Sequence, residues 1–192
     1  MTAGRAAAAA LLAAALGASA GVQAQDANAA LDKARADLAA GKAVDAYLGL
    51  SNTLAVLAPR TPLFLTAARF IDGPMRGYGQ YDPRPHASFT RGEAIRVYVE
   101  PAGFDHRREG EFYRASLACD YAVFAADGKP VTSDRGVKEV ELTSRQANAE
   151  LAIDVVLPYL DLAPGNYTLE IAVRDAVAGD RAQARLAFNI LP

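Results

Sequence analysis

The two histidines are the first side chains to consider for catalysis or metal binding, because imidazole titrates near neutral pH and binds metals. His86 lies two residues after Arg84, and His106 directly precedes Arg107 and Arg108. Histidine metal sites usually show short, regular ligand spacings, and neither histidine is part of one. The neighbouring arginines would also repel a cation. The sequence therefore predicts neither a metal site nor a cofactor.

Serine-based hydrolysis needs a nucleophile that is activated by a base. Four serines are candidates by position, and none of them lies in a Gly-x-Ser-x-Gly elbow: Ser88, Ser116, Ser133 and Ser144. Neither a phosphate-binding loop nor a dinucleotide motif occurs. We therefore interpret the chain as non-enzymatic. One alternative stays open, an exported hydrolase with a site in the loops of residues 73–109 and His86 or His106 as its base.

Tyrosine and arginine gather in a glycine-rich stretch over residues 73–84, outside clear alternation. Tyrosine faces with nearby arginine or aspartate are typical of sugar and peptide sites. A second candidate patch follows at residues 98–104, where a predicted strand runs into a loop. The alternative is a purely structural role, in which the tyrosine rings only cover the edge of a sheet. The candidate binding residues are Arg76, Tyr78, Tyr81, Arg84, Tyr98, Glu100 and Phe104.

Residues 1–24 have the layout of a cleavable secretory signal peptide. Arg5 supplies a positive charge, residues 6–16 contain only alanine and leucine, and small or branched residues at 22 and 24 precede the expected cut. This apolar core is too short to remain as a membrane anchor. We expect a periplasmic or secreted protein.

The net charge of the predicted mature chain limits the classes of partner that it can bind, and its single cysteine limits its disulfide chemistry. Loss of Arg5 would leave 19 basic against 22 acidic side chains, a net charge of −3 rather than the −2 of the whole chain. This mild acidity argues against non-specific binding to nucleic acid or anionic membranes. Cys119 is the only cysteine, so an intramolecular disulfide is excluded, and its apolar neighbours predict a core position.

Residues 25–59 have the apolar period of two helices joined by a turn at Gly41. The hairpin resembles one tetratricopeptide unit in its small Ala34, its turn glycine, its small Ala46 and its bulky Leu50. No second copy follows, and such repeats usually need three or more copies to bury their faces. We therefore do not assign the peptide groove of that family to this chain.

Apolar side chains alternate with polar ones from about residue 60 to residue 192, which is the period of half-buried strands. Turn signals separate the runs, and no helix-length pattern interrupts them. We expect a mainly β fold, a seven-stranded antiparallel immunoglobulin-like β-sandwich with a short N-terminal α-helical hairpin. The seven predicted strands are 63–70, 95–100, 117–123, 139–142, 151–157, 167–174 and 185–190.

The stretch Leu162-Ala163-Pro164-Gly165-Asn166-Tyr167-Thr168-Leu169 is similar to the start of a late strand in immunoglobulin-like and fibronectin type III-like domains. In those families the tyrosine bonds upstream backbone, and the resemblance implies this structural role for Tyr167. The resemblance is to an architecture that hosts many activities. Together with the export signal, it predicts an envelope module of residues 60–192 that binds a protein or glycan partner.

Overall fold

The computed structural model describes residues 27–57, 61–157 and 160–192 of the 192-residue chain. The predicted signal peptide lies outside these residues. The chain divides into two compact units, residues 1–57 and residues 58–192, which are described separately below. Among the described residues, no helix is long and apolar enough to cross a membrane.

The first unit contains the predicted helical hairpin. Residues 27–39 are helical, and α2 spans Ala43–Leu57. Gly41 ends the first helix with a φ of 74°, while the amide of Lys42 donates to the Asp37 carbonyl at 2.8 Å. This geometry is a Schellman cap, in which the residue after the helix has a left-handed backbone. Glycine is favoured there because it has no Cβ atom to clash. Ala34 and Ala46 are buried, so small residues let the helices approach closely.

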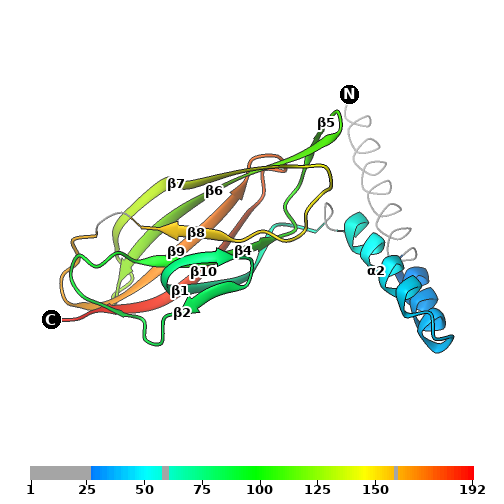
Figure 1. Ribbon diagram of the computed structural model, residues 1–192. Coiled ribbons are helices and arrows are strands. Elements are labelled where there is room, and N and C mark those ends of the chain that lie inside the picture. The colour runs from blue at the N-terminus through cyan, green and yellow to red at the C-terminus, as the bar shows by residue number, and fades with distance from the viewer. Residues whose placement is uncertain (1–26, 58–60, 158–159) are drawn as a thin grey trace, which may run out of the picture. The chain divides into compact units, whose positions relative to one another are not determined.

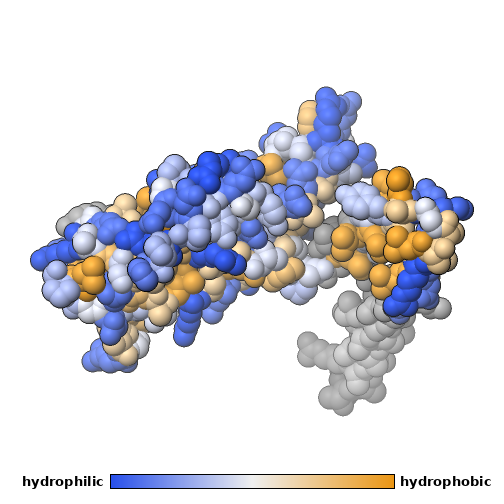
Figure 2. All heavy atoms as spheres, turned by 60° about the horizontal axis from the view of Figure 1, so that its bottom comes forward, coloured by the Kyte–Doolittle hydropathy of each residue, from blue (hydrophilic) through white to orange (hydrophobic). Residues whose placement is uncertain are grey.

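Two helices can cover only part of each other's apolar faces. Figure 2 shows apolar atoms gathered on the helical unit, and Leu31, Leu38 and Leu54 are exposed there.

The second unit is made of two β-sheets (Figure 1). The smaller sheet has the order β2-β1-β4-β8, and all its neighbouring strands are antiparallel. Its strands are β1 (Phe64–Gly77), β2 (Gln80–Pro83), β4 (Arg96–Ala102) and β8 (Ile153–Val156).

The larger sheet has the order β3-β10-β9-β6-β5, and β7 pairs with β6 along most of its length. Only β3 and β10 pair in parallel. Its strands are β3 (Ser88–Phe89), β5 (Arg107–Glu109), β6 (Phe112–Ala125), β7 (Pro130–Ser144), β9 (Gly165–Asp175) and β10 (Arg181–Ile190).

One hydrophobic core is shared by the two sheets, because alternate residues of each strand point inward. Val97 and Val99 of β4 contribute from the smaller sheet, and Ile171 and Val173 of β9 contribute from the larger one. Cys119 of β6 is fully buried in the same core. Burial raises the pKa of its thiol to about 12, with a further contribution from the charge of Asp120.

The mainly β fold with an N-terminal helical hairpin is confirmed. The predicted number of seven strands was wrong, because the described residues form ten. The additional strands are β2, β3 and β5, with four, two and three residues. β3 and β5 contain too few side chains for an alternating pattern, and the segment of β2 shows no clear alternation of apolar and polar residues. β8 is as short as β2, but the apolar Leu151 and Leu157 extend its alternation on both sides.

Tyr167 lies near the start of β9. Its hydroxyl donates to the carbonyl of Ala163 at 2.8 Å, and its ring stacks on Phe188 of β10 with centroids 5.5 Å apart. The side chain therefore ties the segment before β9 to the strand itself.

Candidate functional site

The glycine-rich stretch selected from the sequence forms the β1–β2 hairpin. The register of the pair shifts between Asp72 and Gly77, and Gly73 within this bulge has a φ of 71°. A bulge bends its strand and increases the local twist. The hairpin therefore leaves the plane of the smaller sheet after Asp72.

Two contacts place the bent hairpin over the outer face of that sheet. The ring of Tyr81 in β2 stacks on the ring of Tyr98 in β4, with centroids 4.1 Å apart and planes at 29°. The amide of Met75 in β1 donates to Asp154 of β8 at 3.3 Å. In the sheet β1 lies between β2 and β4, and β4 lies between β1 and β8, so each contact passes over one intervening strand. We call residues 73–83 with Tyr98 and Glu100 the hairpin platform.

Tyr98 anchors the platform. Its side chain has no solvent exposure, yet it lies outside the main core and on the opposite face from Val97 and Val99. Its hydroxyl accepts the amide of Gly79 at 2.7 Å and donates to the Glu100 carboxylate. Burial raises the pKa of Tyr98 to about 12, and the hydrogen bond to Glu100 adds to the rise. The phenol therefore stays protonated and holds the hairpin turn.

Tyr78 lies beside this anchor, at the turn of the hairpin, and is 46% exposed. Partial burial raises its pKa, as do the negative charges of Glu100 and Glu150. A tyrosine with a fixed backbone offers an apolar ring and a hydroxyl to a partner at little entropic cost.

Arg76 and Asp82 form a bidentate ion pair across the hairpin, with N–O distances of 2.8 and 3.1 Å. Hydrogen bonding by Arg76 lowers the pKa of the Asp82 carboxyl. Both side chains are exposed, so water screens the pair and its effect on stability is small. The pair instead gives the same hairpin an exposed positive and an exposed negative group.

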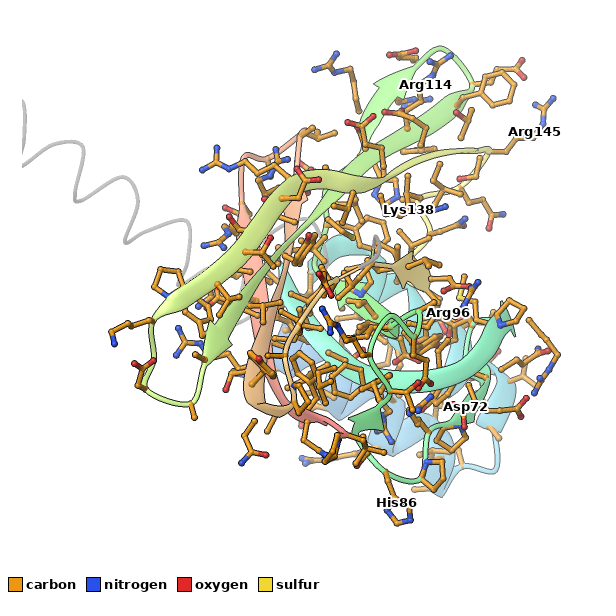
Figure 3. All side chains as sticks on the ribbon, turned by 90° about the vertical axis from the view of Figure 1, so that its left-hand side faces the viewer. Asp72, His86, Arg96, Arg114, Lys138 and Arg145 are labelled. Atoms are coloured by element: carbon orange, nitrogen blue, oxygen red, sulfur yellow. The ribbon has the colours of Figure 1, made fainter. Side chains whose placement is uncertain are left out.

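Asp154 of β8 contacts the platform through Met75, and the sequence alone did not indicate it as a site residue. Its Oδ2 accepts from Arg96 at 2.5 Å, as well as from Met75, whereas its Oδ1 is buried with no hydrogen-bond partner among the described residues. In Figure 3 Arg96 lies between Asp72 below it and Arg114 and Arg145 near the top of the view. The available signal was an acidic residue between Ile153 and Val155, which alternation places on the outer face.

Two of the predicted binding residues lie elsewhere. Arg84 has a side chain that is only 18% exposed, and its guanidinium donates to the Ser88 carbonyl at 2.7 Å. It also pairs with Asp72 and Glu93, so it links strands rather than facing a partner. Phe104 is 2% exposed in the core, and this burial removes it from any surface site.

The histidines show no geometry that favours the hydrolase alternative. His86 is exposed. His106 lies against Phe104, with ring centroids 5.2 Å apart, and its Nε2 is buried without a hydrogen-bond partner in the described part of the chain. Over the same residues, no group of three or more histidine, cysteine or acidic side chains could hold a metal ion.

A comparison with models of known protein families finds no match, and one with curated proteins finds none either. Solved structures give distant likenesses. The Pseudomonas fluorescens DNA glycosylase AlkC is 16% identical, with a TM-score of 0.40 over 69% of this chain and 31% of that one. The C-terminal domain of wzt is 12% identical, with a TM-score of 0.39 over 71% of this chain and 85% of that one.

The sporulation control protein Spo0M of Bacillus subtilis is 10% identical, with a TM-score of 0.36 over 69% of this chain and 50% of that one. The chain thus spans half or less of AlkC and of Spo0M. At these scores, none of the likenesses assigns a family or an activity to the chain.

Proposed function

We propose that the chain is an exported, non-enzymatic envelope protein that binds a protein or glycan partner through the hairpin platform. Export rests on the signal-peptide layout of residues 1–24. An immunoglobulin-like β-sandwich is the architecture that we propose for residues 60–192. Two largely antiparallel sheets around one core and the Tyr167 hydrogen bond support it.

The observation that carries the binding role is the way Tyr78 is held. Its neighbour Gly79 is tied to a fully buried phenol, and Tyr81 stacks on that phenol from above. Binding is favoured when a contact residue is already ordered, because less conformational entropy is lost on association. Exposed tyrosine with adjacent charges is also the composition of many binding hot spots.

The test is a comparison of two aromatic substitutions in the full chain. Immobilised protein is exposed to envelope extract and to purified cell-wall glycans, and bound material is quantified. We expect Tyr78→Ala to reduce binding by about tenfold or more, which corresponds to about 1.4 kcal/mol. The matched control is Phe112→Ala, because Phe112 on β6 is similarly exposed, at 40%, and lies outside the platform. Equal binding by Tyr78→Ala and the unchanged protein would exclude the platform as the binding surface.

A second variant separates preorganisation from direct contact. Tyr98→Phe keeps the ring that stacks on Tyr81 but removes the hydroxyl that accepts from Gly79. We expect faster hydrogen exchange at the Gly79 amide, weaker partner binding, and a loss of about 1–2 kcal/mol in unfolding free energy. Unchanged exchange at Gly79 would show that the phenol does not hold the turn.

A further inference from the structure

A polar pocket lies on the outer face of the larger sheet, the sheet opposite the hairpin platform. Its volume is about 360 Å³, and its walls come from β6, β7, β9 and β10. Its lining includes Asp120, Arg135, Glu170, Ala172, Arg174 and Arg181.

A bulge in β7 makes the hollow. The pairing of β6 with β7 shifts between Cys119, which faces Lys138, and Tyr121, which faces Asp134. Gly136 in this bulge has a φ of 65°, and its amide donates to Asp120 at 2.9 Å. A bulge bends its strand, and β7 bends near Asp120. The residue paired with Asp120 on β9 is Ala172, whose small methyl group forms the floor of the pocket. Space is therefore left above the sheet.

Three acidic side chains line the pocket, and two of them, Asp120 and Glu170, are paired with arginines among the described residues. Asp120 accepts from Nε and Nη2 of Arg174 at 2.8 and 3.0 Å. Glu170 accepts from Arg185 at 3.0 Å and more distantly from Arg181 at 3.4 Å. Burial alone would raise the pKa of Asp120, but the hydrogen bonds from Arg174 and Gly136 outweigh burial and lower it. Asp120 therefore remains charged, and the hydrogen bonds of Asp120 and Glu170 position the arginines.

The arginines keep unused donors. A guanidinium has five N–H groups, and Arg174 uses only its Nε and Nη2 on Asp120. Arg181 forms one long ion pair, with Glu170 at 3.4 Å. The Arg135 guanidinium has no ion pair among the described residues. β7, β9 and β10 thus each contribute one arginine with unused N–H donors to the lining of the pocket. This arrangement is suited to an anionic group.

Pocket size and lining restrict the rest of the ligand. The volume is at the low end for small-molecule sites. Alanine floors the pocket. Ser133 adds a hydroxyl to the wall, and Asp134 adds a carboxylate that accepts the backbone amide of Arg135 at 2.8 Å. A large apolar ligand would find little surface to contact, whereas hydroxyl groups would find both donors and acceptors. We propose that this pocket binds a small hydroxyl-bearing anion of the size of an acidic monosaccharide, either a sugar carboxylate or a sugar phosphate.

Titration of the full chain with four probes, followed by amide chemical shifts, tests the proposal. We expect glucuronate or glucose 6-phosphate to shift the Gly136 amide at concentrations below about 10 mM. Glucose should not shift it, and inorganic phosphate should bind more weakly than the preferred sugar anion. Binding of glucuronate alone identifies a sugar carboxylate, and binding of glucose 6-phosphate alone identifies a sugar phosphate.

Arg135→Gln should weaken this binding about tenfold or more, and the fold should persist because Arg135 has no ion pair to lose. Arg145→Gln is the matched control, since Arg145 is an exposed arginine that follows β7 and lies outside the pocket. Absence of shifts with both sugar anions, or equal shifts in Arg135→Gln, would overturn the proposal. Phosphate binding as tightly as the sugar anions would overturn the hydroxyl part. The hairpin platform plays no part in this test, so its outcome is independent of the proposed function.

Discussion

His106 illustrates how a single side chain can couple stability to pH. It lies between Phe104 and Tyr113, with ring centroids at 5.2 and 6.4 Å, and its Nε2 has no hydrogen-bond partner in the described region. Burial lowers the pKa of His106, although the charges of Asp105 and Asp175 act in the opposite direction. The fold therefore favours the neutral imidazole.

The first prediction follows from the direction of this pKa shift. A histidine whose pKa is lower in the folded state contributes full stability above its unfolded pKa of about 6.5. That contribution is lost as the pH falls toward the folded pKa. We expect the unfolding free energy to decrease from about pH 7 to pH 5, and to decrease less in His106→Phe. Urea denaturation at each pH measures this.

The control is His86→Gln, which removes the exposed histidine and should leave the pH dependence as it is in the unchanged protein. An identical decrease in His106→Phe and the unchanged protein would contradict the assignment to His106.

At the scale of elements, the turn after β4 depends on one glycine. Gly103 has a φ of 73°. A Cβ atom there would lie 2.7 Å from the Pro62 carbonyl oxygen and 2.8 Å from that of Thr61. These are backbone atoms of the segment that leads into β1, so they cannot rotate away. The close approach lets β1 and β4 begin their pairing at Phe64 and Ala102.

The second prediction compares two glycines with the same backbone requirement. Gly128 has a φ of 80°, but a Cβ there would meet nothing within 4 Å. Gly128→Ala should therefore lower the unfolding free energy only by the cost of a left-handed backbone at alanine, about 1–2 kcal/mol. Gly103→Ala adds a backbone clash and should cost at least about twice as much, or prevent folding. Chemical denaturation measures both losses, and equal losses would show that the close approach is relieved cheaply.

At the scale of the whole molecule, the core belongs to one unit. Every residue of the main hydrophobic cluster lies between Leu63 and Ile190. Among the described residues of the helical unit, the buried hydrophobic side chains are the small ones of Ala34 and Ala46. Stability of a domain comes mainly from apolar surface removed from water, and in the described residues most of that surface is in the β unit.

The third prediction is that residues 58–192 fold without the helical hairpin. We expect a cooperative thermal transition with a midpoint within about 5 °C of the full chain, because about 1 kcal/mol shifts the midpoint of a domain of this size by several degrees. Circular dichroism on the fragment and on the full chain makes the comparison. A fragment that melts without cooperativity would show that the hairpin contributes to the fold.

Several features could be predicted from the sequence because they depend on local periodicity. The helical hairpin, with its turn at Gly41, and the longer strands follow from the spacing of apolar side chains. The burial of Cys119 follows from its apolar neighbours. By contrast β2, β3 and β5 show no alternation of apolar and polar side chains, and each is defined by the strand with which it pairs.

The candidate site was predictable only in part. Composition identified the stretch that contains Tyr78 and Tyr81 and the strand that contains Tyr98 and Glu100. Their juxtaposition depends on the bulge at Gly73, which turns the hairpin back over the sheet. Asp154 was missed because it lies 79 residues after Met75 and 58 residues after Arg96, its two hydrogen-bond partners.

The sequence by itself determined seven of the strands of the β unit, the inward face of each long strand and the turn glycine of the helical hairpin, since these follow from local sequence patterns. Only the tertiary structure decided that Phe104 is a core residue, that Arg84 links strands, and that Tyr98 is buried on the outer face of its sheet. The same holds for the pocket above Ala172, whose arginines come from three strands. Such features depend on contacts between residues far apart in the chain, and a one-dimensional pattern does not encode which of them meet.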